Sequence, residues 1–153
     1  MHTEILHRPA NTIAKLTLSQ GEQITTEGGS MVAMSGGLDA ETTTHKRGKM
    51  GIGKAIKRGF AGESFFLNHF TSQKENAELY LAPVLSGDIL HHKMTGTKLV
   101  VQGSSYLAST EGIDVDMGWQ GFKSLIAREG MFWLNLTGAG EVLINAFGAI
   151  YPV

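Results

Sequence analysis

The sequence predicts an all-β protein, a sandwich, barrel or jelly roll built from two copies of one strand-rich unit, with two short helices. Three observations support this fold class. Apolar runs are short and often alternate with polar residues, as in half-buried strands. Glycine makes up 20 of the 153 residues and stands singly or in pairs between these runs, where tight turns are expected. Finally, an order of short phrases in the first half of the chain recurs in the second half.

The expected strands begin with the alternating run Ile13–Leu18. In the run Leu79–Leu85, one face is expected to carry Leu79, Leu81 and Leu85. Pro83 is expected to mark an edge or a bend. Further strands are expected at 29–35, 37–41, 65–68, 98–101, 106–108, 113–117, 131–136 and 141–146. Glycine-containing turns separate most of these runs.

Two segments have helical spacing instead. In Gly51–Phe60, the apolar residues Ile52, Ile56 and Phe60 recur at intervals of one turn, and Trp119–Arg128 has a similar pattern. Both segments contain glycine, which weakens a helix, so each helix would depend on packing rather than on intrinsic propensity.

An internal repeat is the strongest signal in the sequence. The matching phrases are 29–35 with 103–109, 37–41 with 112–116, and 65–68 with 132–135. Each copy has the order strand, turn, strand, short helix, strand. The sequence therefore predicts one compact domain, 1–153, of two structural repeats at about 14–88 and 89–153. A half of this size buries the faces of its own sheet poorly, so the halves should pack together or against other chains.

Composition narrows the function classes. The formal net charge is −1, which argues against a nucleic-acid partner, because dedicated nucleic-acid binders carry a large positive excess. It also permits self-association, since little long-range repulsion opposes it. The absence of cysteine excludes disulfides, zinc–thiolate sites and cysteine nucleophiles. The N-terminus lacks an apolar signal core and no run is long enough to span a bilayer, so a cytoplasmic location is expected.

A basic segment at 45–58 is a candidate contact for an anionic surface. Ile52, Ile56 and Phe60 are interleaved with its charges, as in segments that dock on anionic lipid or on phosphate. The basic residues that could make this contact are Lys46, Arg47, Lys49, Lys54, Lys57 and Arg58. The alternative is a solvated face that keeps an exposed connection soluble.

The segment Gly48–Ala55 fits the spacing of a phosphate-binding loop but does not support nucleotide hydrolysis. Ala55 stands where a serine or threonine hydroxyl would hold magnesium, and no apolar strand precedes the segment. A glycine-rich connection into a short helix is the preferred interpretation.

No catalytic or metal-binding group is predicted, and no cofactor is expected. His91 and His92 are adjacent, so on a strand they point to opposite faces, and His69 is expected to have a structural hydrogen-bonding role. Asp114 and Asp116 alternate with apolar residues, which indicates one wet and one buried face rather than acid–base chemistry.

Aromatic pairs occupy equivalent strands in the two copies. They are Phe65 with Phe66 and Phe132 with Trp133. Packing in the core or at a subunit interface is the default role for these rings. A stacking platform is the alternative, and it would require the rings to be exposed.

Several phrases resemble the altered-inheritance-of-mitochondria family. They are 16–22, 27–34, 58–66, 81–83, 87–89, 103–109 and 121–123, of which the G-G-S-M-V-A-M and G-E-S-F-F phrases are the most specific. The resemblance implies the fold of the tryptophan RNA-binding attenuator protein, here a duplicated double-stranded β-helix, and a homo-oligomer. Family members usually continue beyond the counterpart of Ile150, so this chain is expected to be a bacterial member that lacks the extension, either a short member or a truncated one. An uncovered sheet edge would then favour oligomers.

Two function classes follow, with an unrecognised enzyme as a third. The favoured hypothesis is a non-enzymatic oligomeric scaffold or interaction protein. The alternative is a binding module for a small ligand, an anionic lipid or a nucleic acid, through the 45–58 segment or a cavity between the repeats. The expected partners are further copies of the chain, with another protein or an anionic surface as alternatives.

Overall fold

The computed structural model describes residues 1–45, 65–117 and 133–151 of the chain. Within them the chain forms twelve strands and one short 3₁₀ helix. The elements are β1 (His2–Leu6), β2 (Ile13–Leu18), β3 (Gln23–Glu27), β4 (Met31–Met34), β5 (Leu38–His45), β6 (Phe65–Ser72), β7 (Ala77–Leu81), β8 (Gly87–Thr95), β9 (Leu99–Gln102), η1 (Gly103–Ser105), β10 (Tyr106–Thr110), β11 (Ile113–Met117) and β12 (Trp133–Phe147). The predicted all-β fold class is confirmed.

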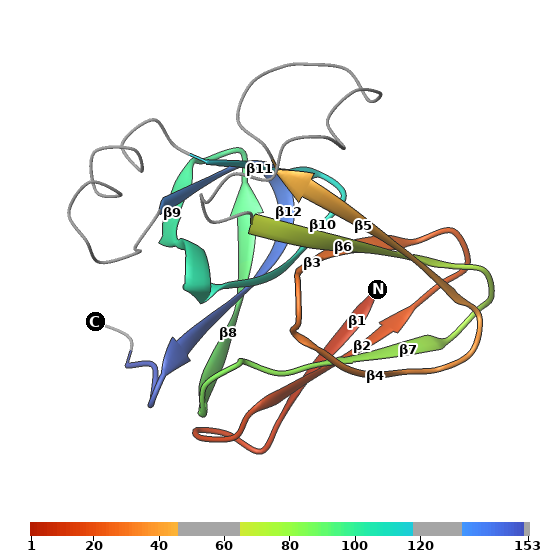
Figure 1. Ribbon diagram of the computed structural model, residues 1–153, viewed down its shortest axis with the longest axis horizontal. Helices are drawn as coiled ribbons and strands as arrows, with labels where there is room; N and C mark the ends of the chain where they lie inside the picture. The colour runs from red at the N-terminus through yellow and green to blue at the C-terminus, as the bar shows by residue number, and fades with distance from the viewer. Residues whose placement is uncertain (46–64, 118–132, 152–153) are drawn as a thin grey trace.

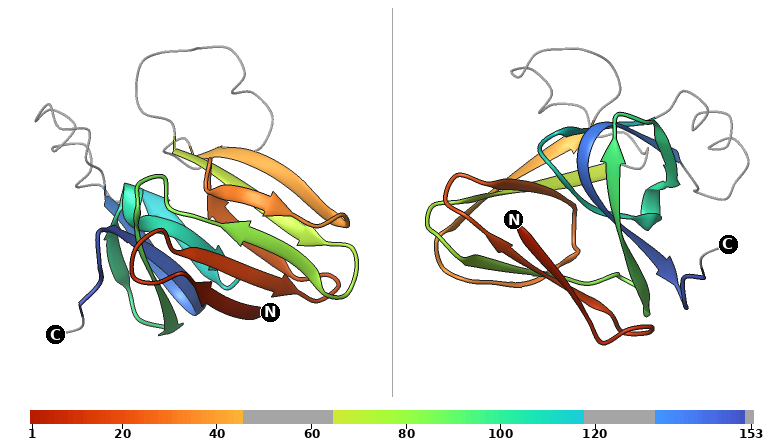
Figure 2. Two further views of the ribbon diagram at one scale, coloured as in Figure 1. Left: turned by 90° about the horizontal axis from the view of Figure 1, so that it is seen from below. Right: turned by 180° about the vertical axis from the view of Figure 1, so that it is seen from behind.

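The strands form two antiparallel sheets (Figure 1). The smaller sheet has the order β1-β2-β7-β4, and the larger one has the order β11-β12-β10-β3-β6-β5, with β8 and β9 also paired to β12. Figure 2 shows the smaller sheet lying as one layer against β3, β5 and β6, so this part of the molecule is a β-sandwich.

The first hydrophobic core lies between these two layers. Alternation in β2 and β7 directs buried side chains from the smaller sheet, including Leu16 and Leu79, against Ile24 of β3 and Phe70 of β6. Leu107 and Leu143 from the second half of the chain join the same core. The two halves therefore share one apolar interior.

A second core is built mainly from the second half of the chain. Tyr106, Leu134 and Val142 belong to it, together with Phe65 and Leu67 at the beginning of β6. Because Phe70 of the same strand belongs to the first core, β6 contributes to both. The strands β6 and β12 thus contribute side chains to both cores.

The last strand differs from the expectation of two strands at 131–136 and 141–146. The structure has one strand there, β12, which pairs with β8, β9, β10 and β11. Gly138 and Gly140 are positions of close approach rather than turn residues, because a Cβ on Gly140 would lie 2.3 Å from Thr110 Oγ1. Gly138 has a φ of 114° and still pairs with Ile113.

The expectation for Leu85 is also wrong. Strand β7 ends at Leu81, two residues before Pro83, and the side chain of Leu85 is 63% exposed in the connection to β8. Proline lacks the N–H that would continue the ladder with β2. Three strands were not predicted, namely β1, β3 and β8, because threonine, histidine and charged residues interrupt their apolar pattern.

The expected helices at 51–60 and 119–128 lie outside the described residues.

The order of the described elements is the same in both halves, since β4, β5 and β6 follow one another as β10, β11 and β12 do. In each half the second and third strands pair antiparallel, β5 with β6 and β11 with β12. The duplication itself stays a prediction.

Candidate functional site

A cavity of about 310 Å³ lies where the two halves of the chain meet. The end of β3 and the connection between β7 and β8 contribute to it from the first half, and the β9–η1 region and the end of β12 contribute from the second. Its lining residues are Glu27, Val84, Leu85, Gln102, Ser104, Ser105, Asn145 and Phe147. Residues of both predicted repeats therefore form it.

Glu27 is the one ionisable residue among the described residues that line this cavity. It is the last residue of β3, where the alternation that buries Ile24 and Thr26 places Glu27 on the other face. Its carbonyl accepts hydrogen bonds from the N–H and the hydroxyl of Ser30, so the chain turns immediately after it. Partial burial raises the pKa of the Glu27 carboxyl to about 7, since desolvation penalises its charged form.

The remaining polar lining comes from the second half. Ser104 and Ser105 lie in η1, Gln102 immediately precedes that helix, and Asn145, only 9% exposed, belongs to β12. Within the described part of the chain, no side chain of these four or of Glu27 hydrogen-bonds to another residue. Five polar residues whose side chains have no hydrogen bond to the described protein thus line one cavity, where they can interact with solvent or with a ligand.

An apolar rim completes the cavity. Val84, Leu85 and Phe147 are 75%, 63% and 79% exposed, so their side chains cover little of the core. Large apolar side chains grouped at the opening of a polar pocket are typical of sites that take a ligand with an apolar part.

Tyr106 of β10 lies buried beside β3, the strand that ends in Glu27. Its hydroxyl donates to the carbonyl oxygen of Thr25 at 3.1 Å and shares a hydrogen bond of 2.8 Å with the Ser109 hydroxyl. Its ring meets that of Phe65 edge-on, with centroids 6.0 Å apart. Burial, with a smaller contribution from the charge of Glu27, raises the pKa of Tyr106 above its ordinary value, so the phenol stays neutral near pH 7.

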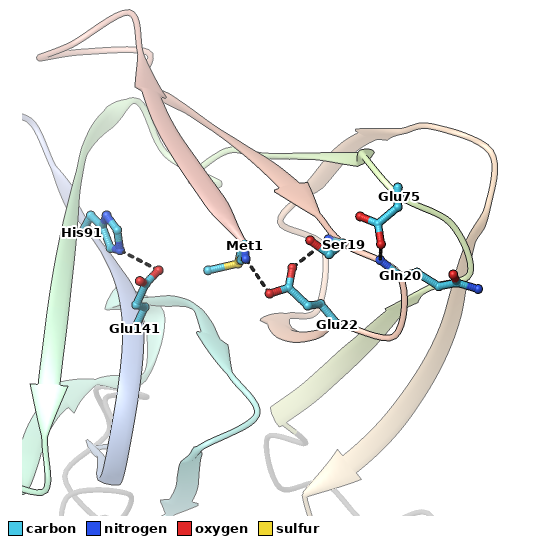
Figure 3. A network of polar contacts seen from close by, with 7 residues as sticks. All are labelled: Met1, Ser19, Gln20, Glu22, Glu75, His91 and Glu141. Carbon is cyan, nitrogen blue, oxygen red and sulfur yellow. Dashed lines mark hydrogen bonds and ion pairs between the residues drawn. The ribbon is translucent and has the colours of Figure 1, made fainter.

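A second cavity, of about 470 Å³, lies between the β2–β3 and β10–β11 turns and contains an acid that is already paired. Glu22 accepts from the amino group of Met1 and, at 2.7 Å, from the N–H of Ser19 (Figure 3). Although partial burial opposes it, these contacts lower the pKa of Glu22 below its ordinary value. The Glu22 carboxylate is therefore already paired within the protein, which makes it a poor candidate for ligand binding.

His69 and His91 contact polar side chains of neighbouring strands. His69 bridges two strands, with its Nδ1 2.9 Å from the Thr25 hydroxyl and its Nε2 2.8 Å from that of Thr43, as expected for a structural role. His91 Nε2 lies 3.1 Å from Glu141, as Figure 3 shows. Among residues 1–45, 65–117 and 133–151, no three histidine, aspartate or glutamate side chains are grouped to hold a metal ion.

The alternation predicted for β11 is present. Ile113 and Val115 are buried, and Asp114 and Asp116 are exposed, so the two carboxylates line a solvated face of the strand rather than an enclosed site. Neither aspartate lines either of the two cavities.

The aromatic residues that the sequence grouped have different environments. Phe65 is buried in the second core, as the packing interpretation expects. Phe66 is 49% and Trp133 43% exposed, so these two rings retain the accessibility that a stacking or interface role requires. Phe132 lies outside the described residues. So do all six basic candidates, namely Lys46, Arg47, Lys49, Lys54, Lys57 and Arg58, and the segment Gly48–Ala55 with them.

Sequence reasoning missed Glu27 and Asn145. A glutamate that ends a threonine-rich strand before two glycines looks like an ordinary turn, and an asparagine within β12 carries no motif. Only the packing of β3 beside β10 and of β10 beside β12 brings these positions to the same cavity.

No helix among the described residues has the length and apolar character needed to cross a membrane. This agrees with the absence of a long apolar run in the sequence.

Comparisons with known proteins identify relatives of the whole chain. The family model described as mitochondrial biogenesis AIM24 matches residues 3–153. The crystal structure of protein SPYM3_0169 from Streptococcus pyogenes is similar, with a TM-score of 0.72 and 21% sequence identity. The match covers 96% of this chain but 65% of that one, so the chain spans just under two thirds of its structural relative. At this identity the likeness concerns the fold. No curated protein matches the chain.

Proposed function

The chain belongs to the mitochondrial biogenesis AIM24 family, and from this premise we propose that it is a non-enzymatic interaction protein that self-associates through the open edge of its smaller sheet. Strand β4 carries this proposal. It pairs with β7 on one side and stands at the end of the strand order β1-β2-β7-β4. Its outer backbone groups are therefore free of any described strand.

The composition of β4 is unusual for an edge. Met31, Val32 and Met34 are 39%, 58% and 45% exposed, and the strand contains neither a charged residue nor a proline. Edge strands are normally protected against pairing by charge, proline or irregularity. Here a register shift between Met31 and Ala33 is the single such feature, and it shortens the regular edge without adding charge.

A second copy of this chain is the partner that fits the edge. Two β4 strands paired antiparallel about a twofold axis would join the smaller sheets and bring like apolar side chains together. No charge on β4 would meet its own image across the axis, and a net charge of −1 provides little repulsion between copies.

Several polar contacts of the described residues join neighbouring strands, which supports a non-enzymatic role. His69 of β6 links β3 to β5 through its two ring nitrogens. The Nζ atom of Lys15 in β2 lies 2.8 Å from Oε1 of Glu78 in β7. A catalytic base would instead be placed beside a nucleophile in a cleft.

We place the protein in the cytoplasm as part of the same proposal, and cell fractionation would test that location.

Sedimentation velocity from about 1 to 200 µM tests self-association, because it detects oligomers with dissociation constants in the micromolar range. The wild-type chain should form a discrete oligomer. Val32→Lys should shift it to the monomer by adding a charge that faces its own copy. Val100→Lys is the matched control, since Val100 is equally apolar and similarly exposed, at 51%, but lies in β9 of the larger sheet. A wild-type monomer throughout this range, or an oligomer that Val32→Lys leaves intact, refutes the proposal.

A second candidate function, contact with an anionic surface, rests on the 45–58 segment. The pairing of His45 with Phe65 brings together the two chain positions that flank 46–64. Flotation with vesicles containing phosphatidylserine should recover the wild-type chain at low salt but not a variant with Lys54, Lys57 and Arg58 changed to glutamate. Equal recovery of both would remove this candidate.

A further inference from the structure

We propose that the cavity lined by Glu27 binds a small organic cation, a primary amine whose ammonium group pairs with the Glu27 carboxylate and whose apolar body contacts Val84, Leu85 and Phe147. This site is separate from the β4 edge. None of the cavity's lining residues belongs to β4, so binding and self-association can be tested independently.

Charge complementarity selects a cation. The described lining contains one acid and no lysine, arginine or histidine, and the Glu27 carboxylate has no described partner. A partly desolvated, unpaired carboxylate is unfavourable, and an ammonium ion would offset that cost with a charge-assisted hydrogen bond. An anionic ligand would instead meet a like charge with no cation to compensate.

The neutral polar groups also fit an ammonium ion. A primary ammonium group has three N–H donors and no acceptor. Besides Glu27, the cavity offers acceptor oxygens from the hydroxyls of Ser104 and Ser105 and the side-chain amides of Gln102 and Asn145. These oxygens are the candidate acceptors for the second and third donors.

The apolar rim and the volume limit the size of the ligand. About 310 Å³ lies at the lower end of the range for small-molecule sites, so a short alkyl or single-ring amine fits and a large ligand does not. The exposed rim side chains would be covered by the apolar body of the ligand, which contributes the hydrophobic part of the affinity.

Protonation of Glu27 would make binding depend on pH. Its pKa of about 7 means that the empty cavity loses its charge as the pH falls below neutrality, which weakens pairing with an ammonium ion. Tyr106 of β10 is the titratable group coupled to Glu27, and its phenol stays neutral in this range. From the other adjoining elements, β6 places Leu67 opposite Glu27, and the described cavity residues of η1 and β12 are uncharged.

Isothermal titration calorimetry and saturation-transfer NMR with three probes of one chain length test the inference. The probes are n-hexylamine, 1-hexanol and hexanoate, which present a cation, a neutral hydroxyl and an anion on the same apolar body. The amine should bind at pH 8 with a Kd of about 1 mM or tighter, a realistic affinity for a ligand of this size. It should bind at least about tenfold more tightly than either other probe.

Two variants and one control locate the site. Glu27→Gln should weaken amine binding about tenfold or more and abolish its weakening between pH 8 and pH 5.5. Phe147→Ser should weaken it a few-fold without changing the pH dependence, and its exposed position makes it a safe test if Glu27→Gln does not fold. Glu111→Gln, an equal change of charge in the exposed β10–β11 turn, should bind as the wild type does.

The inference is overturned if no probe binds at millimolar concentration, or if hexanol or hexanoate binds as tightly as the amine. It is also overturned if a folded Glu27→Gln variant binds the amine like the wild type. Amine binding by a strictly monomeric chain would uphold this inference while refuting the proposed self-association.

Discussion

Arg8 reaches across eighty positions of sequence to Asp88, with its Nε and Nη2 2.9 and 2.8 Å from the two carboxylate oxygens. Asp88 is 2% exposed and also accepts from the N–H of Ile89 and the hydroxyl of Thr12. The guanidinium contact, more than the opposing burial, holds the pKa of Asp88 below its ordinary value. This bidentate pair joins the β1–β2 connection to the beginning of β8, where the second half of the chain starts.

Replacement of Arg8 by alanine is expected to lower the free energy of unfolding by about 1–2 kcal/mol. The buried carboxylate would keep its two neutral donors but lose both charge-assisted bonds. Arg8 is half exposed, which keeps the loss below that of a fully buried pair. Urea denaturation at pH 7 measures it. Arg8→Lys should restore part of the loss, since lysine supplies charge without the planar fork.

The pH dependence provides a check on the same pair. A carboxyl whose pKa is lowered by folding contributes stability above its unfolded pKa, and that contribution disappears as the pH falls through the folded value. The difference in stability between wild type and Arg8→Ala should therefore be constant above about pH 5 and shrink below pH 3.8. A difference that stays constant down to pH 2 would contradict the assignment.

The sequence predicts local structure well where apolar alternation is strong. The runs of β2 and β11 are recovered because their buried positions, apart from Ala14, are isoleucine, leucine or valine. In β3 and β8 the pattern of buried residues depends on strands far along the chain, β6 and β12. The local sequence therefore does not predict which of their residues are buried. The cavity could not be predicted from the sequence for the same reason. Glu27 and Asn145 line one cavity only because β3 pairs with β10 and β10 pairs with β12.

Gly87 is expected to tolerate no side chain. A Cβ at this position would lie 1.9 Å from the carbonyl oxygen of Ala146, a backbone atom held in the β8–β12 ladder. Gly87→Ala should therefore lower the free energy of unfolding by about 3 kcal/mol or more, or prevent folding. Gly36→Ala is the matched control, because nothing lies within 4 Å of its Cβ position. Thermal melts that show equal stability for both variants would contradict the close approach.

The hydroxyl of Tyr106 is expected to stabilise the second core. Tyr106→Phe keeps the ring beside Phe65 but leaves the Thr25 carbonyl and the Ser109 hydroxyl without this partner. The expected loss is about 1–2 kcal/mol of unfolding free energy, measured by urea denaturation. Tyr80→Phe, which removes a hydroxyl that contacts Glu78 at the surface, should change stability little. The prediction is wrong if the two variants have the same midpoint.

Glu27 should make the fold less stable as the pH rises through the slightly acidic range. Its pKa rises from 4.5 in the unfolded chain to about 7 in the folded one, so between these values the folded state binds more protons. The free energy of unfolding then falls with increasing pH across this window and levels off above pH 7. Because Glu27 is partly exposed, the fall should be about 1–2 kcal/mol rather than the full value of the shift.

Comparison of Glu27→Gln with wild type isolates this contribution, since glutamine is neutral throughout and the other titrating groups are common to both chains. The variant should gain about 1–2 kcal/mol relative to wild type between pH 4.5 and pH 8, measured by urea denaturation at pH steps. Glu111→Gln is the control for an equal change of charge, because Glu111 lies in an exposed turn. A difference between Glu27→Gln and wild type that does not vary with pH would mean that the carboxyl remains well solvated, and the charge argument for the cavity would lose its basis.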